Sequence, residues 1–376
     1  MEQSKREPGR RSWQPALKLA LWLRLGYSLF AAVAAWIQPV NWRLVHSNAL
    51  TENLPAPDHS WKYLLLGVWN RFDTLWYLHI AAHRYDRPDA VVFFPLYPSL
   101  VRLMSALVTP MAAALLISTL AAFFLFWGLQ ELLIVDNVPG SGKQSVWLSA
   151  CWPAGFIFFA DYPESLLVAL TIWCLWMGRR ERWLWAAVLG VAAALTKAIG
   201  VIVVVPLLMM GLRQRRPTSL TVLLIPAVVA GYLGYLHWTG HAGLSTVYAQ
   251  YWRTVAAAPW RTLWLGLREL VRAPDAILIL NVMAVVIVGV LASVSGLRIE
   301  YVVFSWAAIF VLLCKETMPP LQSMMRYQLF IFPAFVGMAR VLERIGLGTR
   351  WKMVCAALLI MNLGLLWLFL GWSLVV

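Results

Sequence analysis

Charge is scarce in this 376-residue chain. Only 13% of the residues are charged, whereas 61% are hydrophobic and the mean hydropathy is +0.71. A soluble domain needs a polar surface, and this composition does not supply one. Runs of roughly 20 apolar residues recur along the whole length, each long enough to cross a bilayer core of about 30 Å. These features predict a polytopic membrane protein.

Acidic residues are the scarcer charged kind: Asp and Glu number 17, Lys and Arg 31, and the net charge is +14. The excess of basic residues does not indicate nucleic-acid binding, because the basic residues occur in short clusters between apolar runs rather than on one stripe.

Cysteine is also rare. The 4 cysteines lie inside or at the ends of apolar runs, which predicts buried packing rather than a disulfide framework. They are Cys151, Cys174, Cys314 and Cys355.

The paired histidines lack a metalloprotease motif. His79 and His83 are spaced so that two imidazoles could reach one metal ion, but the glutamate of HExxH is missing between them. Histidines on a polar face, or in contact with a phosphate, are the favoured interpretation.

A signal-peptide cleavage site is also missing and Arg24 interrupts the first apolar run, so we expect an uncleaved first helix.

The apolar runs predict about eleven membrane-spanning segments in one integral membrane domain, residues 1–376. Because a spanning segment must satisfy its backbone hydrogen bonds internally, we expect an all-α polytopic fold. Several runs are short, which predicts broken or paired half-helices around Pro153, Thr196 and Pro333. The runs are 17–38, 110–134, 146–160, 165–178, 183–196, 198–212, 219–238, 276–296, 301–314, 328–341 and 353–374.

The basic clusters fall on one side when the chain is threaded through these segments, and the positive-inside rule makes that side cytoplasmic. The N-terminus, with a basic tail at 1–16, is then cytoplasmic. The other side receives a first large loop at 39–98, where we expect amphipathic helices, and a second at 239–275. Aromatic residues in the second loop favour interfacial anchoring over a role in a substrate groove. The clusters lie at 5–6, 10–11, 179–182, 213–216, 297–300 and 340–352.

Ionisable residues gather on the non-cytoplasmic side, where charges near membrane depth are costly and therefore indicate function. One of them, Asp73, lies in the segment WNRFDTLWYLHIAAHRYD at 69–86. A helix there would hold Asp73 at the membrane interface beside Trp76 and Tyr77, in a poorly hydrated setting that suits a general base. The alternative is a helix cap or a surface salt bridge. The ionisable residues are Asp73, Asp161, Glu164, Lys197, Lys315, Glu316 and Arg326.

Four of these residues suggest a binding site. Asp161 and Glu164, in the connector ADYPES at 160–165, would ligate a divalent cation, orient a substrate hydroxyl, or simply begin a helix. Lys197 and Arg326 interrupt apolar stretches, and would either extend to the membrane interface or hold a lipid phosphate.

An enzyme acting on lipid-linked substrates explains this one-sided placement. A carrier or flippase would place ionisable residues near the midplane of symmetrical halves, and the chain shows no inverted repeat. A non-catalytic subunit of a membrane assembly is the third alternative. The loops, of about 60 residues or fewer, are too short for the doubly wound domain that binds nucleotides. A sugar donor at this face would therefore arrive attached to lipid, as a polyprenyl phosphate sugar.

Four segments resemble, in the same order, those of one enzyme family. They are FDTLWYLHIAAHRYDRPDAVVFFPLYPSL at 72–100, PAGFIFFADYPES at 153–165, ALTKAIG at 194–200 and MRYQLFIFP at 325–333. The chain resembles the GPI mannosyltransferase II (PIG-V) family of GT-C glycosyltransferases, as a prokaryotic relative. It departs from the family at Phe72, where tryptophan is common, at Arg84, where glycine is usual, and at Pro163, where serine is usual.

The resemblance implies a GT-C-like fold and an inverting transfer of mannose, or a similar hexose, from a polyprenyl or dolichyl phosphate sugar. The acceptor would be a glycolipid or a glycan on the non-cytoplasmic face. Asp73 is then the general base that deprotonates the acceptor hydroxyl. Arg326 and Lys197 bind the departing phosphate, with help from Arg71 or His79.

The other implied site residues organise the substrates. Asp161 and Glu164 would do so directly or through a divalent cation such as Mg²⁺ or Mn²⁺. Trp76, Tyr77 and Tyr97 would supply a sugar-stacking or interfacial surface. The implied location is a prokaryotic plasma membrane, or the endoplasmic reticulum membrane in a eukaryote, with membrane lipid as a constant partner.

Overall fold

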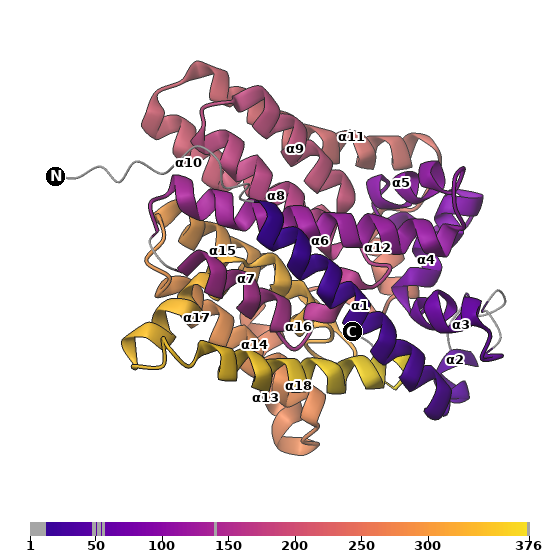
Figure 1. Ribbon diagram of the computed structural model, residues 1–376. Helices are drawn as coiled ribbons and strands as arrows, with labels where there is room; N and C mark the ends of the chain where they lie inside the picture. The colour runs from indigo at the N-terminus through magenta and orange to yellow at the C-terminus, as the bar shows by residue number, and fades with distance from the viewer. Residues whose placement is uncertain (1–12, 47–49, 51–53, 55–56, 139–140, 374–376) are drawn as a thin grey trace.

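The computed structural model describes residues 13–46, 50, 54, 57–138 and 141–373, and its secondary structure is almost entirely helical (Figure 1). Five helical segments are long and apolar enough to cross a membrane. They are α1 (Trp13–Ile37), α6 (Pro110–Val135), the segment Pro217–Trp238 formed by η6 (Pro217–Leu223) and α11 (Leu224–Trp238), α14 (Ala276–Ser293) and α18 (Trp351–Leu370). All five coincide with predicted apolar runs, so the chain is a helical membrane protein, as predicted.

The shorter apolar helices break where the sequence predicts. α7 (Ser141–Cys151) ends shortly before Pro153 and is followed by η4 (Gly155–Phe159). α9 (Trp183–Thr196) ends at Thr196, and η5 (Ala198–Val203) then leads into α10 (Val204–Gln214). Pro333 begins α17 (Pro333–Arg344), after η7 (Gln328–Phe330), because proline fits the first turn of a helix and not its interior.

Ion pairs join several basic connectors at one end of the molecule, here called the basic end. Asp136, after α6, contacts Arg179 of α8 (Glu164–Arg179) at 2.7 Å and Arg298, before α15 (Ile299–Leu313), at 3.2 Å. The predicted clusters at 179–182 and 297–300 therefore lie together. Two more pairs extend this end: Arg213–Glu300 at 2.7 Å and Arg216–Glu181 at 2.9 Å. The predicted basic pairs at 5–6 and 10–11, in the tail 1–16, lie outside the described residues.

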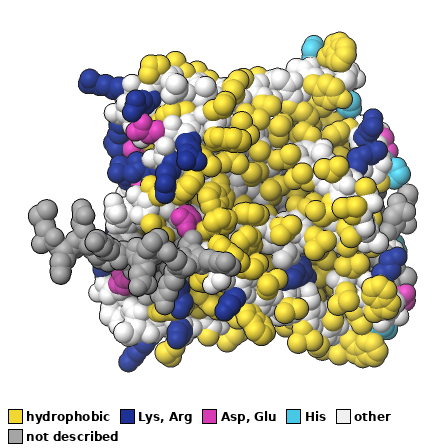
Figure 2. Space-filling model, turned by 45° about the horizontal axis from the view of Figure 1, so that its top comes forward, with side chains coloured by type: hydrophobic (Ala, Val, Ile, Leu, Met, Phe, Trp, Pro, Cys, Tyr) yellow, Lys and Arg dark blue, Asp and Glu magenta, His cyan; other side chains and the backbone are white. Residues whose placement is uncertain are grey.

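Hydrophobic side chains cover the middle of the face in Figure 2, while Lys and Arg gather at its left-hand end. On α1 the exposed residues include Trp22, Leu25, Leu29 and Trp36. Soluble monomers rarely expose so continuous an apolar surface. Lipid is the environment that suits this apolar surface, because lipid chains form no hydrogen bonds with the side chains that they contact.

Two of the predicted loops fold mostly into short helices, and those of the first loop lie at the end opposite the basic end (Figure 1). The first loop contains α2 (Trp42–His46), α3 (Trp61–Leu65), η2 (Gly67–Trp69), α4 (Asp73–His83), η3 (Pro88–Val92) and the start of α5 (Leu96–Met104). The second contains α12 (Leu244–Tyr251), β1 (Thr254–Ala256) and α13 (Pro259–Arg272). β1 pairs antiparallel with β2 (Lys315–Thr317), so that Ala256 lies opposite Lys315, and α16 (Met324–Tyr327) follows.

α4 differs from the expected interfacial helix. Its aromatic residues are buried within the protein instead of facing the membrane boundary. Trp76 stacks on Phe93 with ring centroids 5.6 Å apart, and Tyr77 meets Tyr97 edge-on at 5.0 Å. The reason is that the chain after α4 folds back through η3 and α5 over the aromatic face of the helix.

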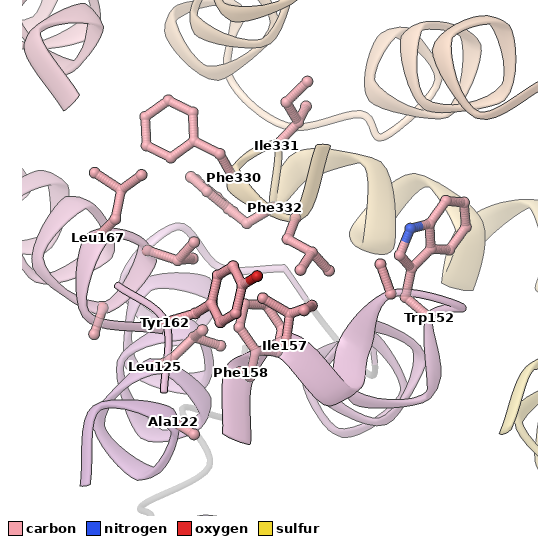
Figure 3. Packing of buried hydrophobic residues seen from close by; sticks show 14 of the residues in the cluster. Ala122, Leu125, Trp152, Ile157, Phe158, Tyr162, Leu167, Phe330, Ile331 and Phe332 are labelled. Carbon is pink, nitrogen blue, oxygen red and sulfur yellow. The ribbon is translucent and has the colours of Figure 1, made fainter. Parts of the chain in front are cut away.

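The core next to these elements combines segments that are far apart in the sequence (Figure 3). Ile157 and Tyr162, around η4, belong to the same buried cluster as Phe330 and Phe332. Phe304 of α15 contacts both of these phenylalanines, with centroids 5.0 and 5.9 Å apart. This packing fixes the connector at 160–163 and the segment at 324–332, which carry or adjoin the charged residues described next.

Candidate functional site

A cavity of about 420 Å³ lies where α4, α12, the paired strands β1 and β2, and α16 meet. Its wall contains charged, aromatic and aliphatic residues. The charged residues are Asp73, Lys197, Lys315 and Arg326. The aromatic residues are Tyr77, Phe93, Phe94, Tyr248, Trp252 and Tyr327, and the bulky aliphatic residues are Val92, Ile199, Val255, Val311 and Leu312.

Asp73 is the first residue of α4, and its side chain is 22% exposed. The N-terminus of a helix favours a negative charge at that position. The preceding residue, Phe72, has φ +50°, a strained backbone conformation for an aromatic residue, and the Asp73 N–H donates to the Tyr162 hydroxyl at 3.3 Å. Strain of this kind persists only where surrounding structure enforces it, which is common beside functional side chains.

Arg326 is the centre of the charged network, and its side chain is only 3% exposed. Nη1 donates to Oδ2 of Asp73 at 2.7 Å, and Nη2 donates to the Tyr327 hydroxyl at 3.0 Å. Nε lies 3.4 Å from Oε1 of Glu164, a carboxylate that is 4% exposed. The guanidinium therefore donates to Asp73 and Tyr327 and lies beside the carboxylate of Glu164, and the buried charges compensate each other.

Lys197 reaches the same network from the break between α9 and η5. Its Nζ donates to Oε1 of Glu164 at 2.7 Å. The chain is extended at Lys197 and then turns back sharply, which requires Gly200, because a Cβ there would collide with the backbone of Ala193. Glu164 thus binds two cations, Lys197 and Arg326, that are far apart in the sequence.

Tyr327 is surrounded by cations. Nζ of Lys315 lies 3.7 Å from its ring centroid, while Nζ of Lys197 and the guanidinium carbon of Arg326 each lie 4.8 Å away. Burial opposes ionisation of the phenol, but the three cations outweigh burial and lower the pKa of Tyr327 to about 7. Burial also lowers the pKa of Lys315, although Tyr327 opposes this shift.

Two predicted phosphate-binding residues, Arg71 and His79, do not line the cavity. Arg71 is buried and donates to the Leu370 carbonyl at 2.8 Å and to the Tyr63 hydroxyl at 3.0 Å. Its role is to tie the start of α4 to the end of α18. His79 lies on the outer side of α4, where it pairs with Asp86 at 2.8 Å. The prediction that they help to bind a phosphate is therefore corrected: the structure does not place Arg71 or His79 in the cavity.

Trp76 and Tyr97 are also absent from the cavity wall. Trp76 lies behind Trp252, with ring centroids 5.2 Å apart, and Tyr97 is fully buried with its hydroxyl 3.2 Å from Ser118. Of the three aromatic residues predicted to stack on sugar, only Tyr77 lines the cavity. Trp76 and Tyr97 support that wall from behind.

Asp161 and Glu164 do not fit a shared divalent cation such as Mg²⁺ or Mn²⁺. Oε1 of Glu164 is already in contact with Lys197 and Arg326, whose charges repel a metal ion. Asp161 is fully buried, and burial raises the pKa of its carboxyl well above the usual range, although Arg24 opposes this shift. Hard cations prefer ionised carboxylates. Within the part of the chain that the structure describes, no group of three or more His, Cys, Asp or Glu is placed to hold a metal.

Sequence reasoning missed five aromatic residues of the cavity and assigned no role to Lys315. The five are Phe93, Phe94, Tyr248, Trp252 and Tyr327. The signal for two of them was the segment YAQYWR at 248–253, which its composition assigned to the membrane interface. In the structure this segment forms one wall of the cavity, whereas the following helix, α13, exposes Trp260 and Trp264.

Comparison with known proteins gives no match: no family model, curated protein or solved structure is significantly similar to this chain. The function is therefore argued from the chemistry of the cavity.

Proposed function

We propose that this protein is a glycosyltransferase that moves mannose, or a similar hexose, from a polyprenyl phosphate sugar to a glycolipid or glycan acceptor. One observation carries the proposal: a partly exposed carboxylate, Asp73, shares a cavity with several cations and an aromatic wall. These are the groups that such a transfer needs, namely a proton acceptor, a site for the departing phosphate and a surface for the sugar.

In the proposed reaction an acceptor hydroxyl attacks the anomeric carbon of the hexose. Its proton passes to the carboxylate of Asp73, and the bond between the anomeric carbon and the phosphate oxygen breaks with its electron pair. The lipid phosphate leaves with a second negative charge, which Lys197 and Arg326 stabilise. A single displacement inverts the anomeric centre, so no covalent intermediate with the protein is required.

The walls of the cavity suit the two ends of a lipid-linked donor. Tyr77, Tyr248 and Trp252 offer rings on which a hexose can stack. Val311 and Val255 line the cavity, and each is 46% exposed. They would offer an apolar exit along which a polyprenyl chain could leave towards the bilayer.

The proposed topology places the basic end in the cytoplasm and the cavity at the opposite membrane surface, in line with the positive-inside rule. About eleven segments would then cross the bilayer, the shorter ones as tilted or paired half-helices. A GT-C-like arrangement in a prokaryotic plasma membrane follows from the sequence resemblance. A donor on that side needs no nucleotide-binding domain, because the sugar arrives already attached to lipid.

The test is sugar transfer by the purified protein in liposomes that contain a radiolabelled polyprenyl phosphate mannose and a lipid extract as acceptor. We expect loss of labelled donor, release of polyprenyl phosphate and label in a new glycolipid, with none of these in protein-free liposomes. Movement of intact labelled lipid between leaflets without release of polyprenyl phosphate would instead identify a carrier. A protein that does neither, while correctly folded, would be a structural subunit.

A further inference from the structure

Lys315 differs from the other two cations of the cavity because it has no carboxylate partner among the described residues. Arg326 is paired with Asp73 and Glu164, and Lys197 is paired with Glu164. Beside Lys315, the carboxylate of Glu316 is already paired with Arg261 at 2.9 Å. Nζ of Lys315 instead lies over the ring of Tyr327.

Below about pH 7 the cavity therefore holds one positive charge that the protein does not compensate. Its three cations, Lys197, Lys315 and Arg326, face two carboxylates, Asp73 and Glu164, and the Tyr327 hydroxyl is neutral in that range. An uncompensated charge that is partly removed from water is costly unless an anion balances it. A phosphodiester carries a single negative charge at neutral pH, so one such group would make the site neutral.

Tyr327 adds a directional donor to this charge. Its hydroxyl oxygen accepts a hydrogen bond from Nη2 of Arg326 at 3.0 Å, so its own proton is left to donate to another acceptor. Lys315 and Tyr327 both line the cavity, and the Lys315 ammonium lies 3.7 Å from the centroid of the Tyr327 ring. Binding an anion here does not require Arg326 to release Asp73, whereas direct binding to Arg326 would.

We propose that Lys315, together with the hydroxyl of Tyr327, is the primary anchor for the phosphodiester of a lipid-linked sugar. This inference rests on the proposed function and refines it: Arg326 and Lys197 remain paired while the donor arrives, and Asp73 keeps its place. The anchor is held by the paired strands β1 and β2, since Lys315 is the first residue of β2, opposite Ala256. The loop at 239–275 therefore contributes to donor binding through β1.

The anchor predicts a pH dependence of donor affinity. As the pH rises through about 7, Tyr327 ionises. Its donor proton is then lost, and its negative charge compensates the positive charge of the cavity. The affinity for a phosphodiester should therefore fall by about tenfold for each further pH unit. The probe itself does not titrate in this range. Groups facing the phenol are Lys315 from β2, Lys197 after α9, Arg326 beside it on α16, Asp73 from α4 and Tyr248 from α12.

In Tyr327→Phe the affinity for the phosphodiester should be lower at pH 6 and nearly independent of pH. A pH profile as steep as that of wild type would contradict this assignment.

The anchor is tested by binding, which does not depend on transfer. The probes are farnesyl phosphate mannose, a phosphodiester, and farnesyl mannoside, which lacks the phosphate, titrated calorimetrically into the full-length protein in nanodiscs at pH 6. We expect Lys315→Gln to weaken phosphodiester binding by about 10- to 100-fold, the loss of a charge-assisted contact, and to leave mannoside binding unchanged. Lys315→Arg should restore most of the affinity. Lys62→Gln, at an exposed lysine of α3, is the matched control.

The outcomes separate the anchor from the proposed function. Equal phosphodiester affinities of wild type and Lys315→Gln, or no binding by wild type, would overturn the anchor, whatever the transfer assay shows. A parallel loss of mannoside binding would also overturn it, because a general distortion of the cavity would then explain the effect. If wild type binds the phosphodiester through Lys315 but transfers no sugar, the anchor stands and the glycosyltransferase proposal fails.

Discussion

Replacing Asp73 with asparagine should slow sugar transfer by about 100-fold or more while the protein stays folded. General-base catalysis contributes about 10²- to 10⁴-fold, and Asp73→Asn removes the proton acceptor without changing the size of the side chain. The amide oxygen can still accept the hydrogen bond from Arg326 that the carboxylate accepts in wild type at 2.7 Å. Donor binding should therefore survive, so the loss should fall on kcat rather than on KM.

The measurement is the initial rate of polyprenyl phosphate release, with thermal unfolding recorded for the same preparations. Asp86→Asn is the matched control, because Asp86 lies in the same segment and pairs with His79 outside the cavity. We expect this control to transfer sugar like wild type. Equal rates for Asp73→Asn and wild type would assign Asp73 a structural role and leave Glu164 as the carboxylate to examine.

The fold could be predicted to a large extent, because the signals for membrane helices are local. The runs at 110–134 and 183–196 match α6 and α9 within a residue or so, since each is bounded by proline, a charge or a polar turn. The break at Pro333 has an equally local cause. What could not be predicted is how the first loop packs: the aromatic residues of α4 suit an interface and an interior equally well, and the choice depended on η3 and α5 folding back.

The site could be predicted in part for a different reason. Asp73, Glu164, Lys197 and Arg326 are far apart in the sequence, and threading the chain through the membrane assigned them to one surface, where the structure indeed brings them together. Threading does not predict the direction of a side chain, so Arg71 was expected beside these charged residues, whereas it points to α18. The pairing of β1 with β2 could not be predicted either, because it depends on contacts between remote segments.

Removing the charge of Arg326 should destabilise the protein strongly. Arg326→Met leaves the carboxylates of Asp73 and Glu164 without their shared cation, and breaking a buried ion pair from one side costs about 3–5 kcal/mol. For a chain of this size that corresponds to a fall in Tm of about 4–6 °C. The measurement is thermal unfolding in detergent, together with the yield of monodisperse protein.

Two comparisons identify the cause of that loss. Arg261→Met removes an arginine that is 64% exposed from its pair with Glu316, so it should cost less than about 1 kcal/mol. The double variant Arg326→Met/Asp73→Asn should recover part of the stability, because the unpaired charge of Asp73 is gone while Glu164 keeps its pair with Lys197. If Arg326→Met melts like wild type, water hydrates both carboxylates and the ion pairs with Arg326 do not stabilise the fold. The cavity would then be well hydrated, and the proposal that Asp73 acts as a base beside a buried guanidinium would fail as well.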